Sequence, residues 1–167
     1  WFANARSAAT SMSRITFRNR TYLDDLVVAE GDGTPGADRD GDGMWDMWEI
    51  EHFGATNAPA GAPGNDADAD GVNNADEYTA DTDPHAGDSF LAITNVTPEA
   101  GGVRLHWQGG RLAEQFVDYN TNLLETADTW QPVASNPPPT ETHMQWLHDG
   151  VTHKAGFYRV RAQRPQR

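Results

Sequence analysis

The stretch Asp38-Arg-Asp-Gly-Asp-Gly-Met-Trp-Asp-Met-Trp-Glu49 places carboxylates at positions 1, 3, 5, 9 and 12 of a twelve-residue run, with glycine at position 6. A second run, Asp66-Ala-Asp-Ala-Asp-Gly-Val-Asn-Asn-Ala-Asp-Glu77, repeats this spacing 28 residues later, with Asn74 at position 9. Loops with this spacing wrap oxygen atoms around a calcium ion. Two complete copies in tandem therefore predict two calcium sites.

The coordination chemistry of calcium explains the spacing. The ion takes about six to eight oxygen ligands at about 2.3–2.6 Å, and alternate residues of a tightly wound loop can all aim inward. Gly43 and Gly71 permit the sharp turn at position 6. Magnesium demands a tighter octahedron, so calcium is the better fit. The candidate ligands are the side chains of Asp38, Asp40, Asp42, Asp46, Glu49, Asp66, Asp68, Asp70, Asn74 and Glu77, and the backbone carbonyls of Met44 and Val72.

Each loop is followed by a predicted helix. Residues 44–53 place apolar side chains on one side, and Gly54 is a natural stop. Residues 72–80 predict a shorter helix. No helix is expected before either loop, because Pro-Gly pairs stand at 35–36 and 63–64. We therefore expect loop-plus-exit-helix units in place of full helix–loop–helix hands.

The acidic residues are concentrated in the middle of the chain. Residues 24–88 carry 18 acids and one base, whereas residues 1–23 carry four arginines and no acid, and residues 89–167 are balanced. Four acids outside the two loops have two readings, as extra ligands or a third site, or as parts of a solvated acidic linker. These are Asp32, Asp81, Asp83 and Asp88.

The order of motifs resembles the thrombospondin type 3-like calcium repeats of bacterial secreted and surface proteins. The resemblance rests on Asp-x-Asp-Gly-Asp-Gly-Met-x-Asp-x-Trp-Glu, on Phe53-Gly54, on Asp-x-Asp-x-Asp-Gly-Val-x-Asn-x-x-Glu-Tyr and on Thr82-Asp83-Pro84. Dockerins use a similar duplicated half-hand, but they usually carry an aliphatic residue at position 8, where this chain has Trp45 and Asn73. The resemblance covers about residues 32–88, and it implies that calcium replaces a hydrophobic core there.

Residues 90–162 predict a small β-sandwich of six or seven short strands. Alternating or apolar segments lie at 90–96, 103–107, 116–119, 129–133, 144–147 and 156–160. The order Trp107, Phe116-Val-x-Tyr119, Leu123-Leu124, Trp130 and Phe157-Tyr-Arg-Val160 resembles the fibronectin III-like C-terminal domains that follow such repeats. The expected organisation is mainly β, with a calcium-loop and short-helix insert at 31–89, the sandwich at 90–162 and a tail at 163–167.

Residues 1–30 predict two strands, at 13–17 and 22–28, which are too few to stand alone. Either they end a lectin-like sheet whose other strands lie upstream, or they complete a sheet in a neighbouring copy by strand addition. The second reading would build a filament, because a head-to-tail contact need not close. The chain begins at Trp1, so we expect a processed product or a piece of a longer protein.

Five tryptophans have competing structural and functional readings. Trp45 and Trp48 are expected between the two calcium units. Trp107, Trp130 and Trp146 are expected in the sandwich core, although a row of them on one outer face would suit sugar stacking. No Gly-x-Ser-x-Gly or His-Glu-x-x-His motif is present, and the six histidines are scattered.

Several function classes are disfavoured. A net charge of −13 opposes binding to nucleic acid, and no apolar run is long enough to insert in a membrane. Gly31-Asp-Gly-Thr-Pro-Gly36 matches a dinucleotide pattern literally, but the acids nearby would repel a pyrophosphate. We expect a non-catalytic, calcium-stabilised extracellular module with a structural or adhesive role, in a bacterial surface protein or a filament subunit. The alternative is a carbohydrate-binding accessory module of a secreted polysaccharide-degrading enzyme.

Overall fold

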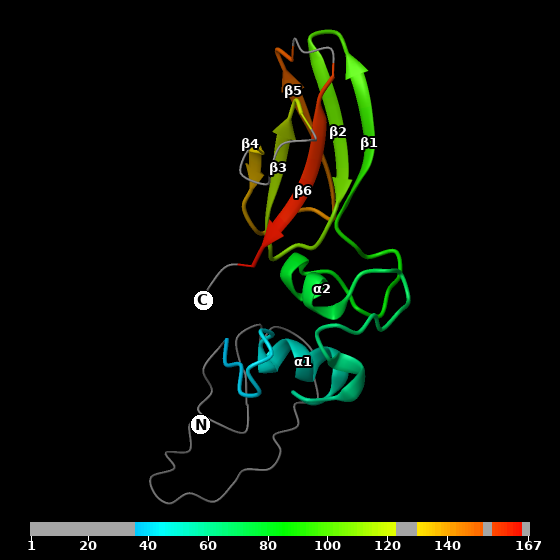
Figure 1. Ribbon diagram of the computed structural model, residues 1–167, viewed down its shortest axis with the longest axis vertical. Helices are drawn as coiled ribbons and strands as arrows, with labels where there is room; N and C mark the ends of the chain where they lie inside the picture. Colours follow the sequence, from blue (N-terminus) through cyan, green and yellow to red (C-terminus); the bar gives the residue numbers. More distant parts are fainter. Residues whose placement is uncertain (1–35, 123–129, 152–154, 165–167) are drawn as a thin grey trace, which may run out of the picture.

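The computed structural model describes residues 36–122, 130–151 and 155–164. It contains a β-sandwich above a smaller loop–helix part (Figure 1). The predicted fold class, mainly β with a short-helix insert, is confirmed for the described residues. The strands predicted at 13–17 and 22–28, together with Asp32, lie outside them.

The loop–helix part contains two short helices, α1 (Asp46–Phe53) and α2 (Asn74–Ala80). Both begin two residues later than predicted, because Trp45 and Asn73 still have the extended backbone of the preceding loops. The Asn73 side chain caps α2 by accepting a hydrogen bond from the Asp76 amide. Gly54 ends α1 with a left-handed φ of 82°, as the sequence predicted.

A short 3₁₀ turn, η1 (Pro59–Gly61), precedes the second loop, where no helical segment was expected. Its first residue is proline, which suits the first position of a helical turn because no amide partner is needed there. Gly61 packs directly against the Phe53 ring, so a side chain at this position would collide with α1. The turn therefore folds the connection back onto the first helix.

The sandwich consists of two three-stranded antiparallel sheets with the orders β1-β2-β5 and β4-β3-β6. All six predicted strands are present, with bounds that differ by a few residues. They are β1 (Ala92–Glu99), β2 (Gly102–Gln108), β3 (Glu114–Asn120), β4 (Gln131–Asn136), β5 (His143–Asp149) and β6 (Phe157–Gln163).

The core of the sandwich lies between the two sheets. Leu105 and Trp107 from β2 meet Val117 from β3, and Trp146 packs against this cluster. The Trp107 indole N–H donates to the buried Gln115 amide oxygen at 2.7 Å, which satisfies both polar groups. Trp130 is half-buried and carries the Arg159 guanidinium 4.6 Å above its ring. Core packing is therefore confirmed for Trp107 and for Trp146.

The two parts meet at the end of α2. Asp81 follows α2 with a left-handed φ of 59°, and its carboxylate accepts hydrogen bonds from the Arg111 and Leu112 amides at the base of the sandwich. The Arg164 guanidinium donates to the same carboxylate at 2.6 Å. Arg164 was predicted to lie in a tail, yet it directly follows β6 and stacks 4.3 Å from the Tyr78 ring.

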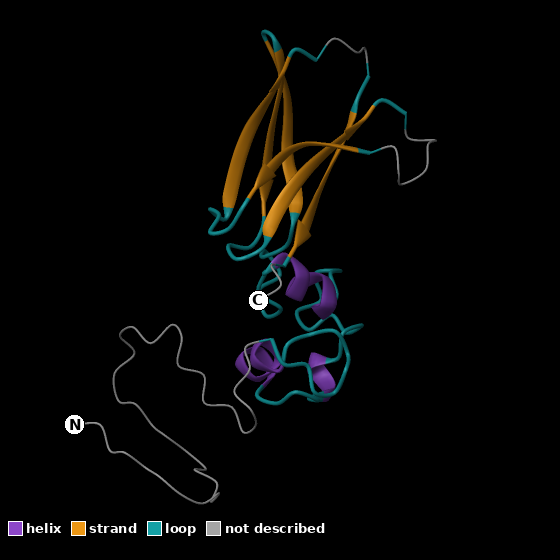
Figure 2. Cartoon of the chain, turned by 90° about the vertical axis from the view of Figure 1, so that its left-hand side faces the viewer, coloured by secondary structure: helices purple, strands orange, loops and turns teal. Residues whose placement is uncertain are grey.

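Figure 2 shows both helices beneath one end of the sandwich, with the strands running away from them. The β1–β2 hairpin lies at the opposite end. No helix within the described ranges is long and apolar enough to cross a membrane.

Candidate metal centre

The two predicted loops have the same hydrogen-bond pattern at their start. The Gly43 amide donates to Asp38 Oδ2 at 3.0 Å, and the Gly71 amide donates to Asp66 Oδ2 at 2.9 Å. At position 4, the amides of residues 41 and 69 each donate to the other oxygen of the same aspartate at 2.7 Å. Backbone donors therefore orient the first carboxylate of each loop before any ligand arrives.

Two further hydrogen bonds also repeat, although the position-5 amide donates to the position-1 carboxylate in the first loop and to the position-3 carboxylate in the second. The amides of Met44 and Val72, at position 7, donate to the position-5 carboxylates at 2.9 and 2.7 Å. Each loop is closed by a backbone hydrogen bond from position 9 to the residue before position 1, at 2.8 Å from Asp46 and at 2.7 Å from Asn74. The 28-residue repeat in the sequence is thus a repeat in the structure.

The first three carboxylates of each loop converge. One oxygen from each of Asp38, Asp40 and Asp42 lies within 4.8 Å of the others, and so do oxygens of Asp66, Asp68 and Asp70. Three carboxylates at this separation repel one another unless a cation lies among them. The donor set is made of oxygen atoms, which hard divalent cations such as calcium prefer.

The glutamates at position 12 are buried beside these clusters. Glu49 is 1% exposed and Glu77 is 0% exposed, and the Oε2 atom of each has no hydrogen-bond partner. In the second loop, Asp68 Oδ2, Asp70 Oδ2 and Asn74 Oδ1 are also buried and unpartnered. Buried polar atoms without partners are rare because desolvation is costly. These oxygens are the atoms that the calcium-loop pattern assigns to the ion.

The electrostatic effect of these clusters is visible in the two glutamates. Burial, followed by repulsion from the loop aspartates, raises the pKa of Glu49 from its ordinary 4.5 to about 7. The same causes raise the pKa of Glu77 from 4.5 to about 7. Burial and the neighbouring carboxylates both favour the neutral acid. A bound divalent cation would supply that charge and favour the carboxylate form.

Position 9 differs between the loops in a way that spacing did not reveal. The buried Asp46 carboxylate is held by Arg39, which donates from its amide at 2.8 Å and pairs through its guanidinium. Asn74 donates its side-chain N–H groups to the carbonyls of residues 60 and 62, both at 2.9 Å. Arg39 is the only basic residue among residues 24–88, and this isolated positive charge was the sequence signal for its role.

An aromatic cluster joins the two loop–helix units. Met44 and Trp48 from the first unit pack on Tyr78 from the second, and Trp48 is 6% exposed. The ring of Trp45 meets Tyr78 edge-on at 6.0 Å. The expected position of Trp45 and Trp48 between the units is confirmed. Since the Met44 side chain is buried in this cluster, its backbone carbonyl is the group that it can offer to a metal.

The additional acids within the described residues, Asp81, Asp83 and Asp88, lie outside both groups of converging carboxylates. Asp81 accepts three hydrogen bonds from the sandwich side of the junction, as described above. Asp83 accepts from the His85 amide at 3.0 Å and lies 3.9 Å from His52 Nδ1. Among the described residues, the carboxylate groups that could hold a metal ion are those of the two loops. Asp81 instead joins the loop–helix part to the sandwich.

Comparisons of the chain with protein-family models, with curated proteins and with solved structures find no significant match.

Proposed function

We propose that this chain is a non-catalytic calcium-binding module in which each loop holds one calcium ion. The observation that carries this proposal is the set of buried, unpartnered oxygens on Glu49, Glu77, Asp68 and Asp70. They occupy calcium-ligand positions of two loops whose hydrogen bonds match. No other described group offers these oxygens a partner.

The residues that would hold the ions follow from this arrangement. In the first loop they are Asp38, Asp40, Asp42, Glu49 and the Met44 carbonyl, and in the second they are Asp66, Asp68, Asp70, Asn74, Glu77 and the Val72 carbonyl. Asp46 would act from outside the first site, because Arg39 already holds its carboxylate. Bound calcium supplies the positive charge that lets the buried glutamates remain ionised.

The role that we propose is structural. Helix α2 carries the ligand Glu77 and ends at Asp81, which binds the base of the sandwich. An ordered second loop therefore fixes where the sandwich sits. Such a connector suits an adhesive bacterial surface protein or a filament subunit. Extracellular modules with loops of this kind bind calcium at about 10⁻⁴–10⁻³ M, and we propose that this chain also acts outside the cell.

Calcium stoichiometry tests the metal assignment. Native mass spectrometry and calorimetric titration should find two ions on the wild-type chain and one on Glu77→Gln. Glu141→Gln removes the same charge from an exposed position of the sandwich and should keep both ions. Two ions on Glu77→Gln, or none on the wild type, would contradict the proposal.

The filament role has a separate test. Light scattering and negative-stain microscopy, with calcium and then with a chelator, measure the size and shape of the particles. Long fibres in calcium would support a self-assembling subunit. Monomers under both conditions would contradict the filament role. The connector role within a longer chain would then remain.

A further inference from the structure

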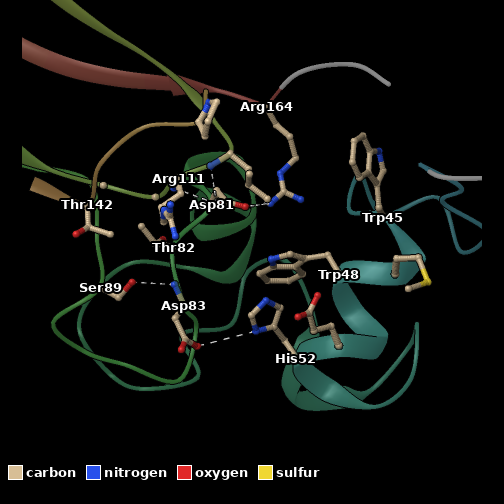
Figure 3. Close-up of a pocket in the computed structure, with 16 residues that line it drawn as sticks. Trp45, Trp48, His52, Asp81, Thr82, Asp83, Ser89, Arg111, Thr142 and Arg164 are labelled. Atoms are coloured by element: carbon tan, nitrogen blue, oxygen red, sulfur yellow. Dashed lines mark hydrogen bonds and ion pairs between the residues drawn. The ribbon is translucent and has the colours of Figure 1, made fainter. Parts of the chain in front are cut away.

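A cleft of about 670 Å³ lies where the loop–helix part meets the base of the sandwich (Figure 3). Its walls come from α1, from residues 81–83 after α2, and from sandwich loops at 109–112 and 139–142. This volume falls within the range of about 300–1,000 Å³ that is usual for small-ligand sites. The junction between two parts of a chain is also a frequent location for such sites.

The α1 side of the cleft is aromatic. Trp48 and His52 lie side by side with ring centroids 4.6 Å apart (Figure 3), and half-buried Trp45 continues this wall. Phe53 and Tyr78 support Trp48 from edge-on positions at 5.8 and 5.4 Å. The rings are therefore held in place without a ligand, which lowers the entropic cost of binding one.

The rim of the cleft is polar and has unused hydrogen-bonding capacity. The side chains of Glu51 and Arg111 are exposed, and neither forms a hydrogen bond to another described residue. Asp83 also lines the cleft, and its amide donates to the Ser89 hydroxyl at 2.9 Å (Figure 3). A ligand with hydroxyl groups could donate to the two carboxylates and accept from the guanidinium.

The charges of the lining select against ionic ligands. Asp81 and Arg164 neutralise each other at 2.6 Å, which leaves Glu51, Asp83 and Arg111 as the other acidic and basic side chains of the lining. A ligand of either sign would therefore meet a side chain of like charge. A purely apolar ligand would strip water from Glu51 and Arg111 without replacing it. A sugar ring combines a C–H face, which suits the aromatic wall, with neutral hydroxyls, which suit the rim.

We propose that this cleft binds a neutral saccharide of one or two sugar units. The half-buried rings of Trp45 and His52 contact the sugar, and buried Trp48 backs the His52 ring. Glu51, Asp83 and Arg111 hold the hydroxyls of the sugar. The inference rests on the proposed calcium function in one respect. Trp48 and Glu51 flank the metal ligand Glu49 on the same helix, so calcium in the first loop orders this wall.

Saturation-transfer NMR and tryptophan fluorescence test the site on the full chain in calcium. The probes are cellobiose, maltose, N,N′-diacetylchitobiose and the anionic sugar glucuronate. At least one neutral disaccharide should bind and change the fluorescence, whereas glucuronate should not. The double variant Glu51→Ala/Arg111→Ala should weaken that binding by about tenfold or more. Glu99→Ala/Arg104→Ala removes an equivalent pair at the far end of the sandwich and should bind like wild type.

Three outcomes would overturn the inference: no neutral probe binds, glucuronate binds as well as the neutral sugars, or the Glu51→Ala/Arg111→Ala variant keeps full affinity. If the chain binds two calcium ions but no saccharide, the inference of a saccharide site is refuted and the proposed function stands. Saccharide binding by a chain that takes up no calcium would refute the proposed function and the ordering of the wall by calcium.

Discussion

The Arg164 guanidinium lies 2.6 Å from the Asp81 carboxylate, which joins the end of the last strand to the end of the second helix. The same arginine stacks on Tyr78, a member of the aromatic cluster between the two loops. One side chain thus touches both the loop–helix part and the residue that docks that part onto the sandwich.

Asp81→Asn should loosen this junction while both loops keep their calcium. Asparagine tolerates the left-handed backbone at this position, so the substitution removes mainly the charge. Loss of a charge-assisted hydrogen bond should lower the free energy of unfolding by about 1–3 kcal/mol, measured by denaturant titration. Glu99→Gln breaks the exposed pair with Arg104 and should cost about 1 kcal/mol or less. Equal losses in both variants would argue against a special role for Asp81.

Ala69→Gly should raise the stability of the second loop. Ala69 has a φ of 65°, whereas the equivalent position in the first loop is Gly41, with a φ of 75°. A left-handed backbone costs a residue with a Cβ about 1–2 kcal/mol, and the added freedom of glycine in the unfolded chain offsets part of this gain. We expect a net gain of about 0.5–1 kcal/mol in thermal unfolding. Ala80→Gly, inside α2, should have the opposite sign.

Gly110→Ala should separate the loop–helix part from the sandwich. A Cβ atom at this position would lie 1.9 Å from the Asp81 carbonyl oxygen and 2.4 Å from that of Ala80. These are backbone atoms, so the junction itself must move. Small-angle scattering should report a more extended particle than wild type. At Gly64, where an added Cβ meets nothing within 4 Å, the same substitution should leave the scattering unchanged.

Removal of calcium should unfold the loops before the sandwich. The sandwich has its own apolar core around Leu105, Trp107 and Val117, whereas the loops depend on carboxylates that repel one another. Each proposed site, if it binds calcium, should add about 2.7 kcal/mol when free calcium is 100 times the dissociation constant. In a hydrogen-exchange experiment with a chelator, the backbone amides of residues 38–77 should lose protection. The amides of β2 and β3 should keep it. Asp42→Ala and Asp70→Ala should each abolish one site, and full stoichiometry in either variant would contradict the ligand assignment.

Acid should destabilise the sandwich through His148. Its Nδ1 lies 2.9 Å from the Tyr158 hydroxyl, and burial lowers the pKa of His148 below its ordinary 6.5. The folded state therefore favours the neutral ring, so stability is fully present above about pH 6.5 and falls as the pH drops below it. Melting temperatures from about pH 7.5 to about pH 5.5 should show this loss. It should shrink in His148→Phe and persist in His106→Gln.

The spacing of residues in the sequence was enough to predict the loops, the exit helices and the six strands. These features depend on neighbours within about a dozen residues, such as Gly43 turning the loop or Gly54 ending the helix. The contacts that the sequence did not predict join distant residues. Arg164 and Asp81 are 83 positions apart, and no local pattern marks either as a partner. The ion pair between Arg39 and Asp46 was also not predicted, because the calcium pattern assigned the Asp46 carboxylate to the ion.

The closing hydrogen bond of each loop, from position 9 to the residue before position 1, makes the two loops closed rings of equal size. The first unit also presents an apolar surface to the second, where Met44 and Trp48 pack on Tyr78. A chain built this way can change its length by whole units without redesigning either end. The length of the loop–helix part beneath the sandwich then becomes an adjustable quantity, set by the number of repeats.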